Sequence, residues 1–150
     1  MTSTTITSAA PVPEAALELL ERSRAGLFAA AMSVHAGERY VTAHLSALRA
    51  AAAVLATRSR PSRRSSGPRS VWEVLPRIAP ELTEWAAFFA AGADRRAALE
   101  AGRVETVPVR AADDELRAAE TFVALVESGL GVTHPGRLPL VASGLRPARP

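Results

Sequence analysis

The chain has 150 residues, a formal net charge of +3 at pH 7 and no cysteine. A chain of this length is expected to form one domain with its own core, and the lack of cysteine excludes disulfides and thiolate chemistry. No apolar run reaches the roughly 18 residues that a membrane-spanning helix needs, and the N-terminus does not resemble a secretory signal. We therefore expect a cytoplasmic protein without a membrane-spanning segment.

The first helix is predicted to follow Pro13, because Glu14 then lies in the first turn, where a carboxylate is favoured by the helix dipole. Residues 1–12 are expected to be a disordered lead-in. The helix has an apolar stripe of residues spaced three or four apart, namely Leu17, Leu20, Ser23, Leu27, Ala31 and Val34, with Leu19 and Phe28 beside it. A tight turn is expected at residues 33–37.

The second helix is predicted over about residues 38–57, and the short link makes it an antiparallel partner of the first. Its predicted core stripe consists of Val41, Leu45, Leu48, Ala52 and Leu55, with His44 and Ala51 beside it.

Residues 58–69 form a basic segment that contains two prolines and no acidic residue, and a flexible loop is expected there. The segment carries five arginines, which are Arg58, Arg60, Arg63, Arg64 and Arg69. These side chains could attract RNA phosphates, or they could be the charges of a solvated linker. The segment has no aromatic residue on which bases could stack.

A short helix is expected after Ser70, which can cap it, and Pro80 suits the first turn of a further helix that extends to about Gly102. The aromatic residues of this region have helical spacing and are expected in the core; they are Trp72, Trp85, Phe88 and Phe89.

The last helix is predicted from about Ala111 to Leu130, with an acidic start at Asp113, Asp114 and Glu115 that complements the helix dipole. Its apolar seam is narrow and is formed by Leu116, Ala119, Val123, Val126 and Leu130. Residues 131–150 are rich in proline and are expected to be a disordered tail. The sequence thus predicts an all-α protein, a small helical bundle over residues 13–130 with four main helices and one short helix.

The order of these parts, and above all the stretches "AHLSALRAAAAVLA" and "ELTEWAAFFAAGADRRAA", resembles the HEPN superfamily of small helical bundles. More narrowly, the chain is similar to a small actinobacterial family of HEPN-domain proteins, over about residues 14–130. The resemblance implies an association with RNA and a homodimer. It also implies two kinds of relative: metal-independent ribonucleases of toxin or defence systems, and non-catalytic modules that accompany a nucleotidyltransferase or an antitoxin.

Active members of the superfamily carry an arginine and, four to six residues later, a histidine near the start of the last long helix. In this chain Arg39 and His44 have such a spacing, but they lie on the second helix, where their side chains point roughly 140° apart. The corresponding region of the last helix contains Arg110, Asp113 and Asp114, without a histidine.

We therefore expect a non-catalytic HEPN module that binds RNA, a nucleotide or a protein partner. One alternative is a ribonuclease that uses Arg39 and His44 across a dimer, and another is a plain scaffold for protein interactions. His35 and Glu38 are too few to form a metal site, and no cofactor is predicted.

Overall fold

The computed structural model describes residues 11–58, 70–103, 107–132 and 147, and the structural statements below concern these residues. Three expectations fall largely outside them: the disordered lead-in, the flexible basic segment apart from Arg58, and most of the tail.

The described chain consists of five α-helices and one short 3-10 helix, which confirms the all-α class. The elements are α1 (Glu14–Met32), α2 (Ala36–Arg58), α3 (Val71–Ile78), η1 (Pro80–Leu82), α4 (Thr83–Glu100) and α5 (Val109–Gly129). The short helix begins as expected, because the Ser70 hydroxyl accepts a hydrogen bond from the backbone N–H of Trp72 at 3.3 Å. The last helix begins two residues earlier than predicted, directly after Pro108, whose φ of −57° suits a helix start.

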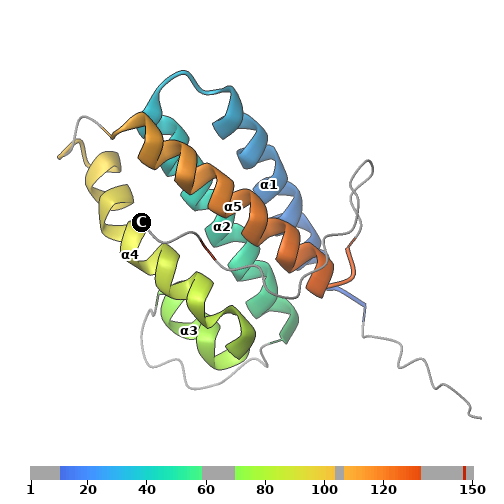
Figure 1. Ribbon diagram of the computed structural model, residues 1–150. Helices are drawn as coiled ribbons and strands as arrows, with labels where there is room; N and C mark the ends of the chain where they lie inside the picture. The colour runs from blue at the N-terminus through green and yellow to red at the C-terminus, as the bar shows by residue number, and fades with distance from the viewer. Residues whose placement is uncertain (1–10, 59–69, 104–106, 133–146, 148–150) are drawn as a thin grey trace, which may run out of the picture.

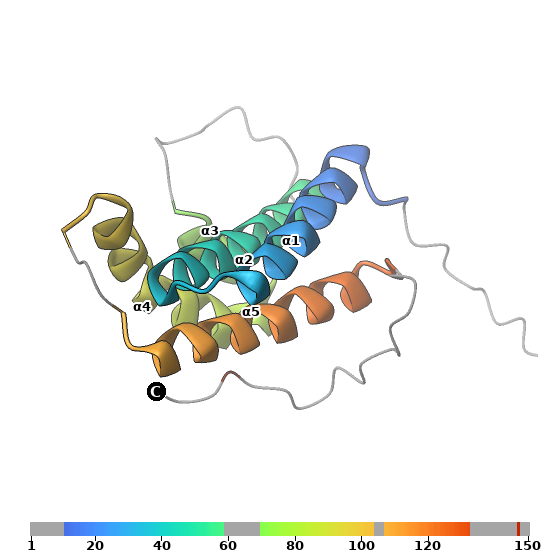
Figure 2. The same ribbon diagram turned by 90° about the horizontal axis from the view of Figure 1, so that it is seen from above.

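Helix α2 is the centre of the bundle. It packs antiparallel to α1, lies alongside α5 and also contacts α3 and α4, as Figures 1 and 2 show from two directions. Its most deeply buried apolar residues are small, namely Ala43, Ala47, Ala50, Ala51, Ala53 and Val54. Small side chains let the neighbouring helices approach closely, so the large aliphatic residues of the predicted α2 stripe are only half-buried.

Helix α1 buries Leu20, Ser23 and Leu27 of its predicted stripe, together with small residues that the prediction did not include. Its buried residues are Ala16, Leu20, Ser23, Gly26, Leu27 and Ala30. A Cβ atom added at Gly26 would collide with the Ser46 hydroxyl of α2, so the two helices are in close contact at this point. Phe28 and Val34, which were expected at the core, are instead 72% and 85% exposed. The expectation was wrong because the contact with α2 follows the small residues of α1.

Aromatic rings fill the space between α3, α4 and α5. Trp72 stacks on Phe89 with ring centroids 5.0 Å apart, and Phe89 lies 5.3 Å from Phe122. Trp72, Trp85 and Phe89 are at most 4% exposed, which confirms their expected place in the core. Phe88 is partly buried and packs against the same cluster.

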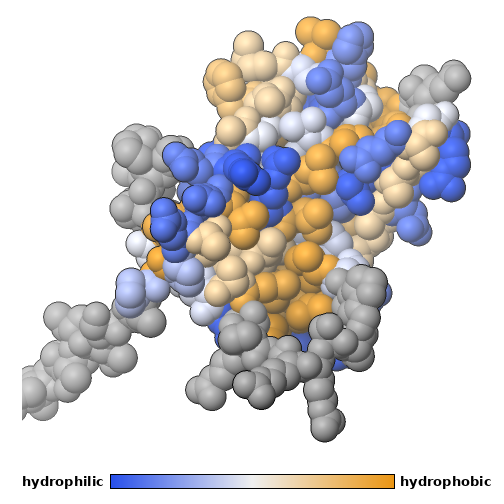
Figure 3. Space-filling model, turned by 180° about the vertical axis from the view of Figure 1, so that it is seen from behind, coloured by the Kyte–Doolittle hydropathy of each residue, from blue (hydrophilic) through white to orange (hydrophobic). Residues whose placement is uncertain are grey.

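Hydrophobic residues also reach the surface. Seen from behind, they occupy the middle of the molecule between hydrophilic regions (Figure 3). Among the helices that the structure describes, none has the length and hydropathy needed to cross a membrane.

Candidate functional site

Two polar pairs connect α2 with the first half of α5. The guanidinium Nη1 of Arg39 donates to Oδ1 of Asp113 at 2.6 Å, and Nδ1 of His44 lies 3.0 Å from Oε1 of Glu115. The structure therefore joins two regions that were separate candidates in the sequence: the arginine and histidine of α2, and the acidic start of α5. The carboxylates of α5 do more than complement a helix dipole, since each of these two has a partner on α2.

The inner pair lies in the core. The side chains of His44 and Glu115 are only 1% and 5% exposed. The rings of Trp72 and Phe89 lie edge-on to the imidazole, with centroids 5.8 and 5.9 Å away. The hydrogen bond between the buried imidazole and the buried carboxylate satisfies one polar atom of each side chain. Removing either side chain would leave the other buried without this partner, in a medium of low dielectric constant.

The outer pair closes one end of the bundle. Besides its bond to Asp113, Arg39 donates from Nη2 to the carbonyl oxygen of Ser33 at 2.8 Å. The side chain of Arg39 is 17% exposed and that of Asp113 is 39% exposed. Arg39 thus fastens the turn between α1 and α2 to the first turns of α5.

Tyr40 extends this polar region to α4. Its hydroxyl donates to the carbonyl oxygen of Gly92 at 3.4 Å, and the Arg95 guanidinium lies 5.7 Å from the centre of its ring. A Cβ atom at position 92 would lie 2.6 Å from the Tyr40 hydroxyl, so a glycine is needed for this approach. Burial raises the pKa of Tyr40 to about 12, and the nearby charge of Glu115 acts in the same direction, while Arg95 opposes both.

The remaining residues of the family-motif region lie on the surface. Arg110 is exposed. Asp114 forms an ion pair with Arg117 one turn later on the same helix, at 3.8 Å. Of the basic segment, Arg58 is described and pairs with Glu81 of η1; Arg60, Arg63, Arg64 and Arg69 lie outside the described residues.

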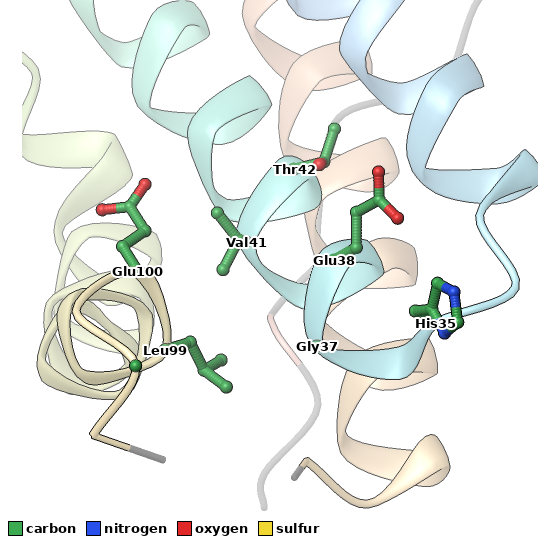
Figure 4. A pocket seen from close by; sticks show the side chains of 8 residues that line it. His35, Gly37, Glu38, Val41, Thr42, Leu99 and Glu100 are labelled. Carbon is green, nitrogen blue, oxygen red and sulfur yellow. The ribbon is translucent and has the colours of Figure 1, made fainter. Parts of the chain in front are cut away.

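A cleft of about 590 Å³ lies between the start of α2 and the end of α4 (Figure 4). Val41 and Leu99 line it between two carboxylates, those of Glu38 and Glu100, which come from different helices. Glu38 accepts a hydrogen bond from the Ser33 hydroxyl at 2.9 Å, and Glu100 accepts one from Arg96 at 3.1 Å. Within residues 11–58, 70–103 and 107–132, no three His, Asp or Glu side chains converge as metal ligands.

Four large apolar side chains protrude from one end of the bundle, and we call them the exposed apolar set. They are Phe28, Met32, Val34 and Val109, which are 72%, 68%, 85% and 63% exposed. Sequence reasoning missed this set, because it assigned Phe28 and Val34 to the core. The sequence did contain a signal for this set. The first helix has apolar residues beside its main stripe, Phe28 among them, and a single packing contact with α2 does not need both rows.

Comparison with known proteins identifies one family. The model of the SAV_6107-like HEPN family matches residues 29–127, from the second half of α1 to the last turns of α5. No curated protein and no solved structure matches the chain.

Proposed function

The chain belongs to the SAV_6107-like HEPN family, and from that premise we propose that it is a non-catalytic HEPN module that assembles with a second copy of itself through the exposed apolar set. The observation that carries the proposal is the exposure of these four apolar side chains. In the same bundle His44, the histidine on α2, is buried.

The environment of His44 supports a non-catalytic role. A general acid or base must come within hydrogen-bonding distance of the atom whose proton it transfers. His44 is 1% exposed, its Nδ1 faces Glu115, and two aromatic rings flank it. The rival hypothesis, a ribonuclease that uses Arg39 and His44 across a dimer, requires α2 and α5 to separate first.

The positions of the four apolar side chains support a protein partner. Phe28 and Met32 are one turn apart on α1 and therefore share a face. Val109 lies one turn before Asp113, and Arg39 holds Asp113 and the backbone of Ser33 together. The end of α1 and the start of α5 thus lie at the same end of the bundle (Figure 2). Large apolar groups that are exposed at one end of a molecule are typical of interaction surfaces.

A second copy of the chain fits this surface because a two-fold interface uses the same patch on both subunits and needs no other component. RNA or a nucleotide would instead use charged groups. The five arginines of residues 58–69 begin at the opposite end of α2, about 34 Å away along a helix of 23 residues. A nucleotidyltransferase or an antitoxin is the alternative protein partner for the same apolar surface.

Light scattering after gel filtration, at tens of micromolar protein, tests this proposal. The wild type is expected at twice the monomer mass of 15.8 kDa. Replacing Phe28 and Met32 by aspartate should give monomers with an unchanged helical circular-dichroism spectrum, since neither side chain is part of the core. Ala87→Asp, on the exposed side of α4, is the matched control and should remain dimeric. A monomeric wild type would contradict self-assembly. The exposed apolar set would then be assigned to the binding of a different protein.

A further inference from the structure

A second hollow lies at the other end of the bundle, where α2 and α5 end and α4 begins. Its volume is about 410 Å³, within the range of small-molecule sites. Leu82, Trp85, Leu125 and Leu130 are among the residues that line it. The hollow is separated from the exposed apolar set by the length of α2, so it is independent of the proposed interface.

One ion pair lies at this hollow. Arg58, the last residue of α2, donates from Nη1 to Oε1 of Glu81. The two side chains are 35% and 54% exposed. The hydrogen bond from Arg58 lowers the pKa of Glu81, so the carboxylate is charged at neutral pH. Solvated pairs of this kind contribute little to stability, so Arg58 can exchange its partner at small cost.

Among the described residues that line the hollow, Arg58 is the only cationic one, and Ser128 lines it as well. A guanidinium offers several N–H donors in the planar arrangement that matches a carboxylate. The hollow therefore presents an apolar wall that ends at an anion-binding group.

We propose that this hollow binds a small aliphatic carboxylate, with the hydrocarbon chain against Trp85 and the leucines and the carboxylate on Arg58. The bound carboxylate replaces Glu81 as the partner of the guanidinium. Glu81 then competes with the ligand for Arg58 and weakens its binding. A cationic ligand would instead be attracted by Glu81, so removing this carboxylate has opposite effects on anionic and cationic ligands.

Calorimetric titration of the full chain with decanoate tests the inference, with decyltrimethylammonium and decanol as probes of the same chain length. Decanoate is expected to bind with a dissociation constant on the order of 100 µM, and the other two at least about tenfold more weakly. Glu81→Gln removes the competitor and should tighten decanoate binding by about threefold or more, whereas Arg58→Gln should weaken it by about tenfold.

Gly129→Leu supplies a steric test, because Gly129 lines the hollow and an added Cβ atom there has no heavy atom within 4 Å. The leucine should reduce binding strongly without lowering the melting temperature, while Ala87→Leu on α4 should change neither. Three results would each overturn the inference: no binding at millimolar decanoate, equal binding of the ammonium probe or decanol, or unchanged binding by Gly129→Leu. The mass measurement above is unaffected by any of these, so the two proposals fail separately.

Discussion

Tyr40 provides a quantitative test of the polar region between α2, α4 and α5. It is the only tyrosine of a chain without lysine or cysteine, so no other side chain titrates between about pH 9 and 12. The pKa of this phenol is raised from 10.0 to about 12 in the folded protein. Folding therefore disfavours the tyrosinate. The resulting contribution of Tyr40 to the free energy of unfolding is fully present below pH 10. It is lost as the pH rises from 10 to 12, because only the unfolded chain releases the phenol proton in that range. A shift of this size corresponds to roughly 2 kcal/mol of unfolding free energy.

Urea unfolding at a series of pH values in this window measures the loss, and the near-ultraviolet absorbance of tyrosinate measures the pKa directly. Tyr40→Phe is the matched control: it removes the proton and keeps the ring, so its unfolding free energy should stay nearly constant over the same window. A phenol that titrates near its ordinary pKa in the folded protein would refute the buried position of Tyr40. An equal alkaline loss in the phenylalanine variant would also refute it.

Three further predictions follow from contacts elsewhere in the bundle. Gly26→Ala should destabilise the protein by about 1–3 kcal/mol in urea unfolding, because the new methyl group meets the Ser46 hydroxyl, and adding Ser46→Ala should restore most of the loss. Phe89→Ala should lower the unfolding free energy by about 3–5 kcal/mol, since its ring is fully buried among aromatic neighbours; a loss below 1 kcal/mol would contradict that packing. Arg24→Gln should destabilise the protein less in a Glu127→Gln background than in the wild type, because the two side chains form a partly buried ion pair between α1 and α5.

The helices and their order could be predicted from the sequence because their signals are local. Pro13, Ser70 and Pro80 mark helix starts through backbone geometry and capping, and each lies at or beside an observed helix start. The aromatic core was also predictable, since a tryptophan at helical spacing has few other places in a small bundle.

The faces of the helices were harder to predict, because the packing depends on small residues that carry little signal in an alanine-rich chain. Rules based on large aliphatic residues assigned Val41 and Leu45 to the core of α2, yet alanines occupy its centre. In the same way Phe28 was assigned to the core, although Gly26 and Ser46 determine how α1 approaches α2.

The polar pairs could not be found by spacing within one helix. Arg39 and His44 point in different directions on α2, and each contacts a different carboxylate of α5. Their partners Asp113 and Glu115 lie more than 70 residues later, and only the packing of α5 against α2 brings them together. Long-range partners of this kind leave no periodic signal in a single sequence.

Incubation of the wild-type protein with total cellular RNA in EDTA tests most directly whether His44 is structural. We expect the length distribution of the RNA to remain unchanged over hours, and we expect His44→Ala to lose stability by about 3–5 kcal/mol, because Glu115 is then buried without its partner. RNA cleavage by the wild type that is absent in a folded His44→Ala variant of unchanged melting temperature would contradict the account.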